Sequence, residues 1–152
     1  MVKTVIALAA DHAGFQLKEV LIEDVRSLGF EPLDLGTHGL ESVDYPDFGH
    51  AAADAVLSGR AAYAVICCGT GIGISMAANK HRGIRAALCH DATTARLARE
   101  HNDANILALG ARIVGSEVAR DCLRTFLATP FGGERHVSRV DKIDHVRTKE
   151  AV

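Results

Sequence analysis

Short apolar runs alternate with amphipathic segments along most of the chain. Residues 4–10 are continuously apolar and partly β-branched, a pattern typical of a parallel strand covered on both faces. The next apolar positions recur at helical spacing, at Leu17, Val20, Leu21, Val25 and Leu28. Gly29 follows where helices commonly end. The chain therefore begins with a predicted strand and a predicted helix.

This order of strand and helix repeats as far as residue 127. Further strands are predicted at residues 30–35, 63–68, 84–89 and 105–109. Helices are predicted from a cap at Asp47, over 74–80, from a cap at Asp91 to about Glu100, and over 116–127. Residues 130–133 interrupt the pattern, and residues 134 to about 149 are interpreted as a polar C-terminal helix.

About five strands that alternate with helices indicate an α/β fold, a doubly wound Rossmann-like domain with three layers around a parallel sheet. The length of 152 residues fits a single domain over residues 1–152. Ligands of such folds bind outside the carboxyl ends of the strands, so residues that directly follow a strand are the first functional candidates. Residues 36–46 form the only stretch that suits a mobile lid.

Composition and charge narrow the range of partners. Hydrophobic residues make up 48% of the chain and charged residues 24%, which is typical of a globular protein. Lys and Arg number 17 against 19 Asp and Glu, a net charge of -2, so we expect no nucleic-acid partner. The apolar residues 5–10 are too few for a secretory signal or a membrane span. We therefore expect a cytoplasmic protein with no membrane partner.

A glycine-rich turn follows the strand predicted at 63–68. Gly69, Gly71 and Gly73 alternate there between the strand and the next helix, where unpaired backbone N–H groups favour an anion. We interpret the turn as a cradle for an oxyanion or a phosphate. Its spacing departs from the dinucleotide fingerprint G-x-G-x-x-G, and no nucleotide P-loop follows. A tight connection without a ligand is the alternative.

Four cysteines, at positions 67, 68, 89 and 122, lack the spacing of metal ligands. We expect free thiols, because a cytoplasmic compartment keeps them reduced, and no metal site. Cys68 ends its strand directly before the glycine turn, where a helix N-terminus favours the thiolate and makes a thiolate base plausible. Cys67 should face the opposite side of the strand and fill the core. Core filling is equally the alternative for Cys68.

Other polar candidates follow or precede predicted strands. Asp11 and His12 directly follow the first strand, so they should lie at the same edge of the sheet as the glycine turn. The alternative for Asp11 is a cap of the following helix. His101 and Asn102 precede the last strand, and their alternative is a polar turn.

Arginines near the C-terminus suit a phosphate group. Arg112 follows the last strand, and Arg135 and Arg139 are four residues apart in the predicted final helix. That spacing places two guanidinium groups on one helix face, from which they can converge on one phosphate. A solvated helix face is the alternative.

Five motifs together resemble ribose-5-phosphate isomerase of type B, a family that also holds allose-6-phosphate and galactose-6-phosphate isomerases. The motifs are Asp11-His12-x-Gly14-Phe15, Asp44-Tyr45-Pro46, Cys68-Gly-Thr-Gly-Ile-Gly with Ala77-Ala78-Asn79-Lys80, Gly83-Ile84-Arg85-Ala86, and His101-Asn102-Asp103-x-Asn105. The resemblance extends from Val5 to about Val140. It implies an aldose–ketose isomerase of carbohydrate metabolism, in the pentose phosphate pathway, that acts on ribose 5-phosphate through an enediolate without a metal or an organic cofactor.

The resemblance also implies roles for individual residues. Cys68 would be the base between C1 and C2 of the sugar, and the backbone amides of residues 69–73, with Thr70, would stabilise the enediolate. His101 with Asp11 would open the furanose ring, and Asn102 would hold sugar hydroxyls. The phosphate would be bound by His12, Arg112, Arg135 and Arg139. The family forms homodimers with a shared active site, so some of these residues should come from a second subunit; a tetramer is the alternative assembly.

Three alternatives to this function stay open. The substrate could be allose 6-phosphate or galactose 6-phosphate, because linear sequence does not give the distance from the phosphate cluster to the base. A nucleotide-binding or flavodoxin-like module shares the fold class, although it would need a different phosphate loop. A non-catalytic sugar-phosphate-binding regulatory module is the remaining class.

Overall fold

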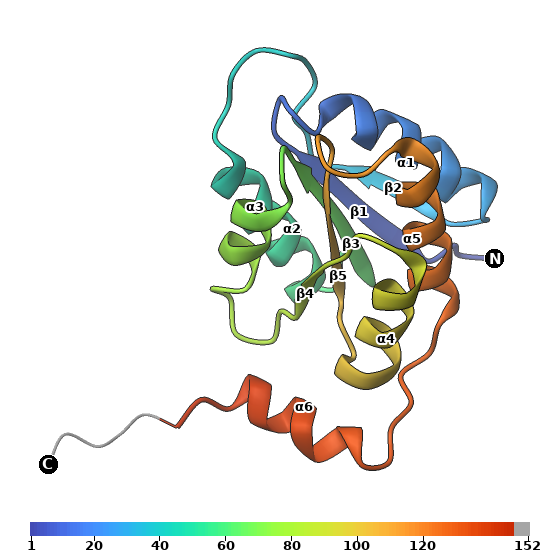
Figure 1. Ribbon diagram of the computed structural model, residues 1–152, viewed down its shortest axis with the longest axis vertical. Coiled ribbons are helices and arrows are strands. Elements are labelled where there is room, and N and C mark those ends of the chain that lie inside the picture. Colours follow the sequence, from blue (N-terminus) through green and yellow to red (C-terminus); the bar gives the residue numbers. More distant parts are fainter. Residues whose placement is uncertain (148–152) are drawn as a thin grey trace, which may run out of the picture.

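Five parallel strands form the centre of the computed structural model, which describes residues 1–147 (Figure 1). The strands are β1 (Val5–Ala10), β2 (Glu31–Asp34), β3 (Tyr63–Cys68), β4 (Ala86–Leu88) and β5 (Ile106–Gly110). Their order across the sheet is β2-β1-β3-β5-β4, and all neighbouring pairs are parallel. The predicted doubly wound α/β fold is therefore confirmed.

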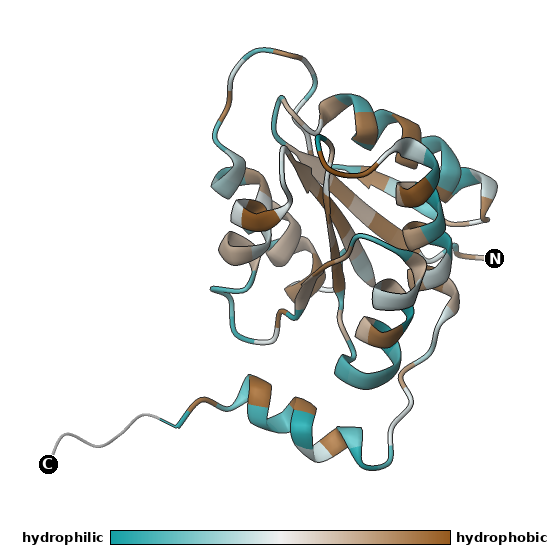
Figure 2. Ribbon diagram, viewed as in Figure 1, coloured by the Kyte–Doolittle hydropathy of each residue, from teal (hydrophilic) through white to brown (hydrophobic). Residues whose placement is uncertain are grey.

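Helices cover both faces of this sheet (Figure 1). One layer holds α1 (Phe15–Ser27), α4 (Ala92–Asn102) and α5 (Ser116–Ala128), and the other holds α2 (Tyr45–Leu57) and α3 (Ile72–Ala78). Each layer packs on the sheet through its own apolar cluster. Figure 2 shows the apolar colour concentrated on the strands and on the sheet-facing sides of the helices. Burial on both faces explains why the strands read as continuous apolar runs.

The register of the strands aligns their ends on two opposite sides of the sheet. Cys67 pairs with Ala10, and Cys68 pairs with Gly110, so β1, β3 and β5 end at the same level. We call this side the carboxyl edge, and the opposite side, where the strands begin, the amino edge. Residues that follow β1, β3 and β5 come together at the carboxyl edge, as the sequence predicts.

Two glycines allow close packing at the carboxyl edge. Gly71 has a φ of +78°, and a Cβ on it would lie 2.9 Å from the backbone carbon of Leu109. A Cβ on Gly14 would lie 2.6 Å from the backbone carbon of Cys67. Side chains at these positions would collide with strands that cannot move. The first turns of α1 and α3 therefore lie directly against the strand ends.

The start of α2 differs from the prediction. The helix begins at Tyr45, with Asp44 at the N-cap position and Asp47 inside the first turn. The prediction that Asp47 caps this helix is therefore wrong. Pro46 explains the earlier start, because its fixed φ suits the first turn of a helix.

The final helix is shorter than predicted. It spans α6 (His136–Asp144), because Gly133 and Glu134 have positive φ values of 66° and 51° that a right-handed helix excludes. Residues 148–149 of the predicted helix lie outside the described residues. Val140 alone is buried on α6, which lies beside α4 at the amino edge (Figure 1). Across residues 1–147, no helix is both long enough and apolar enough to span a membrane.

Candidate active site

Cys68 ends β3 at the carboxyl edge, with only 4% of its surface exposed. Its Sγ accepts a hydrogen bond from the backbone N–H of Gly71 at 3.1 Å. A backbone N–H donor at this distance stabilises negative charge on sulfur. Its side chain belongs to the apolar cluster under α2 and α3. The structure thus joins the thiol to the glycine turn through a direct contact.

Cys67 faces the other side of the sheet and belongs to the cluster under α1, α4 and α5. Burial raises the pKa of the Cys67 thiol to about 12, so this group stays protonated at neutral pH. The prediction that Cys67 fills the core is confirmed. Two neighbouring thiols therefore have different surroundings, because successive side chains of a strand point to opposite faces.

The glycine turn is held by contacts on both sides. Its Thr70 Oγ1 accepts a hydrogen bond from the N–H of Ile72 at 3.2 Å, and the carbonyl of Gly69 accepts one from the N–H of Arg112 at 2.9 Å. The Arg112 side chain lies beside Gly69, since a Cβ there would be 3.5 Å from Nη1. Gly73 packs on the ring of Tyr45, which leaves no space for a side chain. Cys68, Thr70 and Arg112 thus share one small region.

Asp11 and His12 lie at the same edge, directly after β1. Asp11 is buried, and its Oδ1 accepts a hydrogen bond from the N–H of Gly14 at 3.0 Å. The carboxylate therefore holds the turn that leads into α1, but it does not cap the helix, whose N-cap residue is Gly14 and has no side-chain cap. His12 is half-buried, and its Nδ1 accepts a hydrogen bond from the N–H of Val43 at 3.2 Å. This bond ties the loop between β2 and α2 to the end of β1.

The other candidates gather at the amino edge. His101 and Asn102 are the last two residues of α4, and the ring of His101 stacks on His136 with 4.4 Å between centroids. Arg135 occupies the N-cap position of α6, and Arg139 lies within that helix. Desolvation lowers the pKa of His136, and the nearby His101, Arg135 and Arg139 lower it further. The structure therefore brings these basic side chains into one cluster.

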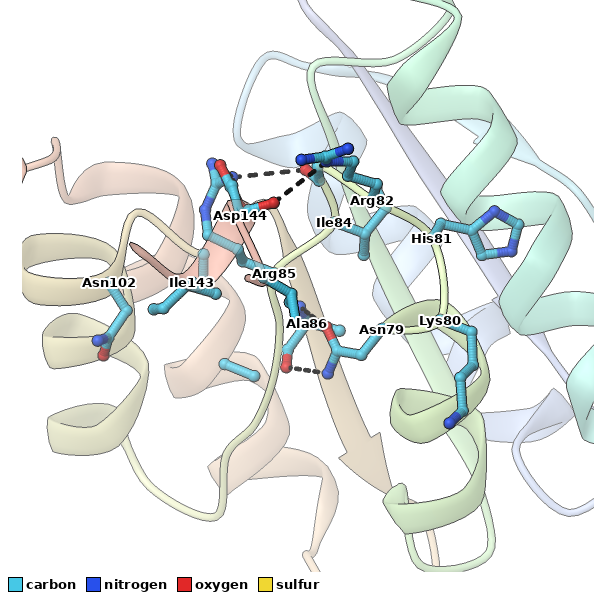
Figure 3. Close-up of a pocket in the computed structure, with 14 residues that line it drawn as sticks. Asn79, Lys80, His81, Arg82, Ile84, Arg85, Ala86, Asn102, Ile143 and Asp144 are labelled. Atoms are coloured by element: carbon cyan, nitrogen blue, oxygen red, sulfur yellow. Dashed lines mark hydrogen bonds and ion pairs between the residues drawn. The ribbon is translucent and has the colours of Figure 1, made fainter. Parts of the chain in front are cut away.

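Sequence reasoning assigned no role to Arg85, which holds this edge together. Its Nη1 lies 2.9 and 3.2 Å from the two carboxylate oxygens of Asp144 on α6, and its Nε donates to the carbonyl of Asp103 at 2.9 Å. Figure 3 shows the Arg85–Asp144 pair beside a pocket of about 660 Å³ that Asn102 also lines. Cys68 does not line this pocket. The sequence points to Arg85 through its place in the motif Gly83-Ile84-Arg85-Ala86.

The two groups of candidates are separated by the length of the sheet. Cys68 pairs with Gly110 at the end of β5, whereas His101 and Asn102 precede Ile106 at its start. Four steps along a strand span about 13 Å at roughly 3.3 Å per residue. A single chain therefore does not bring His101, Asn102, Arg135 or Arg139 to the thiol of Cys68. Within residues 1–147, no three His, Cys, Asp or Glu side chains are grouped to hold a metal ion.

The fold and these residues define a doubly wound α/β enzyme with a buried thiol at the carboxyl edge of its sheet. A profile of the family described as Ribose/Galactose Isomerase matches residues 6–143, and the chain belongs to that family. The prediction that it is an aldose–ketose isomerase is confirmed at this level.

Curated relatives and similar solved structures agree with this assignment. Ribose-5-phosphate isomerase B of Escherichia coli K12 is 41% identical over 144 residues, which cover 95% of this chain and 97% of that protein. The structure of ribose-5-phosphate isomerase B of Clostridium thermocellum has a TM-score of 0.92 at 52% identity, and the match covers 93% of this chain and 95% of that one. The Thermotoga maritima ribose 5-phosphate isomerase also has a TM-score of 0.92, at 50% identity, with 94% and 99% covered.

Proposed function

We propose that the chain interconverts ribose 5-phosphate and ribulose 5-phosphate, with the Cys68 thiolate as the base. The observation that carries the proposal is the hydrogen bond from the Gly71 N–H to Sγ of Cys68, at 3.1 Å in a nearly buried site. A thiolate needs such a donor to persist away from water. The names of the Escherichia coli and Clostridium thermocellum relatives support this choice of substrate.

The chemistry is a proton transfer between two neighbouring carbons. The thiolate of Cys68 removes the proton from C2 of the open-chain aldose, and the electron pair of that bond forms the C1–C2 double bond of an enediolate. Negative charge develops on O1, where backbone N–H groups of residues 69–73 and the hydroxyl of Thr70 stabilise it. The proton on O2 moves to O1, and the thiol returns its proton to C1 to give the ketose. No electron leaves the substrate, so this sequence is redox neutral overall.

The remaining roles divide between ring opening and binding. His101 with Asp11 opens the furanose ring before the proton transfer, and Asn102 holds the sugar hydroxyls. The phosphate is bound by His12, Arg112, Arg135 and Arg139. The basic cluster around His136 supports this assignment, because its positive groups lie close enough to depress the pKa of that imidazole. An anion placed among them would be favoured by several charges at once.

A second copy of the chain supplies half of each site in this proposal. The separation of Cys68 from His101 by the length of β5 supports it, because one chain alone leaves the two groups at opposite edges. Exposed apolar side chains on the peripheral helices also support it. Met76 on α3 is 62% exposed, and Ile143 on α6 is 50% exposed. A partner subunit packed on these helices would remove both side chains from water.

A hexose 6-phosphate is the second candidate substrate, because the matching family is described by both ribose and galactose. The phosphate of a hexose lies one carbon farther from C1. The discriminating measurement is kcat/KM for ribose 5-phosphate, allose 6-phosphate and galactose 6-phosphate on the same preparation. A preference for either hexose phosphate would overturn the pentose assignment and leave the role of Cys68 intact.

The decisive test of the mechanism is Cys68→Ala, with Cys67→Ala as the matched control. General-base catalysis contributes about 10²- to 10⁴-fold, so Cys68→Ala should lose at least that much of kcat. Cys67→Ala should retain most activity, because its thiol lies in the core and stays protonated. Exchange of the C2 hydrogen of ribose 5-phosphate with solvent should disappear only in Cys68→Ala. A loss below about 5-fold, or exchange that persists, would reject Cys68 as the base.

A further inference from the structure

Lys18 is the least expected buried residue of the fold. It lies on the first turns of α1 with none of its surface exposed, and its Nζ donates to Oδ1 of Asp34 at 2.7 Å and to Oε1 of Glu19 at 3.1 Å. Removing an ammonium group from water costs several kcal/mol, and a buried ion pair is often no more stabilising than an apolar side chain of similar size. Stability alone therefore explains the position poorly, and its contacts indicate a different role.

Asp34 links Lys18 by hydrogen bonds to the backbone that follows β2 and lies beside β1. It is the last residue of β2, and its Oδ1 also accepts a hydrogen bond from the N–H of Gly36 at 2.9 Å. Burial raises the pKa of Asp34, but hydrogen bonds from Lys18 and Gly36 outweigh it and hold that pKa below its usual value. The carboxylate therefore remains charged and keeps both donors.

The backbone after Asp34 is hydrogen-bonded to Ala10, the residue that directly precedes the site residues Asp11 and His12. The carbonyl of Gly36 accepts a hydrogen bond from the N–H of Ala10 at 2.8 Å, and the N–H of Thr37 donates to the carbonyl of Ala10 at 2.7 Å. The loop that begins here extends to Asp44 and lies over the end of β1 (Figure 1). Its start is thus anchored on the residue that precedes Asp11.

The same loop returns to His12 at its far end. The N–H of Val43 donates to Nδ1 of His12 at 3.2 Å. A neutral imidazole that accepts at Nδ1 carries its proton on Nε2. Nε2–H is then a fixed donor, which is the form that binds an anionic oxygen. The loop therefore selects one tautomer of a residue assigned to phosphate binding.

We propose that Lys18 is a positioning residue that acts through Asp34 and the loop 35–44 to hold His12 in its Nε2–H tautomer. The consequence for phosphate binding rests on the proposed function, whereas the tautomer does not. Lys18 touches no reacting group and supplies no proton. Its contribution is to keep the loop where Val43 reaches the imidazole.

The test measures the tautomer and the kinetics of the same variants. Lys18→Met removes the charge and keeps an unbranched side chain, and it leaves Asp34 to water because 32% of that side chain is exposed. Arg120→Met is the matched control, since Arg120 of α5 also forms an ion pair with a carboxylate of α1, Asp24, at 3.0 Å. Long-range ¹H–¹⁵N spectra of histidine-labelled protein, assigned with His12→Asn, report which ring nitrogen of His12 carries the proton.

We expect the parent and Arg120→Met to show the Nε2–H tautomer of His12, and Lys18→Met to show a mixture. If the binding form falls to about one third, KM for ribose 5-phosphate and the inhibition constant of inorganic phosphate rise about threefold at constant kcat. Parent-like His12 signals in folded Lys18→Met would overturn the proposal. If that variant does not fold, Asp34→Asn decides by the same spectra. A parent without isomerase activity would reject the proposed function, while the tautomer comparison would still judge this inference.

Discussion

The two edges of the sheet are built in different ways. At the carboxyl edge, Cys68 and Asp11 are buried and bonded to backbone N–H groups only three residues away, those of Gly71 and Gly14. At the amino edge, Arg139 and Asn102 are exposed. The helix that carries Arg139 is held by Arg85, which is 59 residues from its partner Asp144. Cys68 and Asp11 of the carboxyl edge are thus part of the core, whereas the helix that carries Arg139 is a peripheral attachment.

This difference divides the proposed reaction into two kinds of task. Proton transfer needs groups held to within a fraction of an ångström, and the short backbone contacts around Cys68 suit that requirement. Binding a phosphate tolerates more movement, because charge acts over a longer distance than a proton transfer. Arg135 and Arg139 on the amino edge suit that second task, which His12 and Arg112 share from the carboxyl edge. The first prediction below tests both edges together, and the others test the amino edge alone.

The largest effect should come from mixing two inactive variants. Cys68→Ala damages the carboxyl edge and His101→Asn the amino edge, and each should be nearly inactive on ribose 5-phosphate. If one chain supplies Cys68 and its partner supplies His101, a mixed dimer has one intact site and one doubly damaged site. Random reassembly of an equal mixture should therefore restore about one quarter of the parent activity.

Each variant unfolded and refolded alone is the control and should recover nothing. The measurement is activity on ribose 5-phosphate after joint refolding. A joint preparation as inactive as its components would show that the two edges do not meet across subunits.

The next largest effect is expected from Arg139→Ala. A hydrogen bond to a charged group contributes about 1.5–3 kcal/mol, so loss of this contact to phosphate should raise KM roughly ten- to hundredfold. Inhibition by inorganic phosphate should weaken in parallel. Arg124→Ala is the control, because Arg124 is exposed on α5 and pairs only locally with Asp121 at 3.3 Å. An unchanged KM in Arg139→Ala would remove this arginine from the site.

Asp144→Asn should have a smaller effect of the same kind. The amide keeps the shape of the side chain but loses the charge that pairs with Arg85, so α6 spends less time in its binding position. The apparent affinity falls with the fraction of molecules in that position, and we expect KM to rise about threefold at constant kcat. Asp141→Asn makes the same change on the exposed side of α6. Equal kinetics of the two variants would show that the Arg85–Asp144 pair does not position the arginines.

The smallest expected effect is a shift in the titration of His136. Desolvation and then nearby positive charge disfavour the imidazolium form, so the pKa of His136 lies below its usual value. Arg139→Ala removes one of those charges and should move the midpoint of the His136 titration to higher pH. The measurement is an NMR titration of the ring protons. A midpoint that moves downward or stays in place would contradict the described cluster.

Sequence patterns predicted the carboxyl edge better than the amino edge. The end of β3, the glycine turn and the opposite facing of Cys67 and Cys68 depend on neighbours in the chain, so local rules suffice. The Arg85–Asp144 pair depends on the order of strands and on where α6 ends, which no local pattern contains. The sequence pattern indicates that Lys18 is buried, because it lies at helical spacing from the buried Ile22 and Val25. Its residue type points the other way, since lysine is almost never fully buried unless it is paired.

The opposite facing of Cys67 and Cys68 has a consequence for oxidative damage. Cys67, Cys89 and Cys122 all belong to the cluster on one face of the sheet, and Cys68 belongs to the other. Consecutive Cα atoms are about 3.8 Å apart, closer than the roughly 4.4 Å that a disulfide ordinarily requires. A sulfenic acid formed on Cys68 by peroxide therefore has no resolving thiol within its own chain. Its repair depends on small thiols such as glutathione reaching the carboxyl edge before a second oxidation makes the loss permanent.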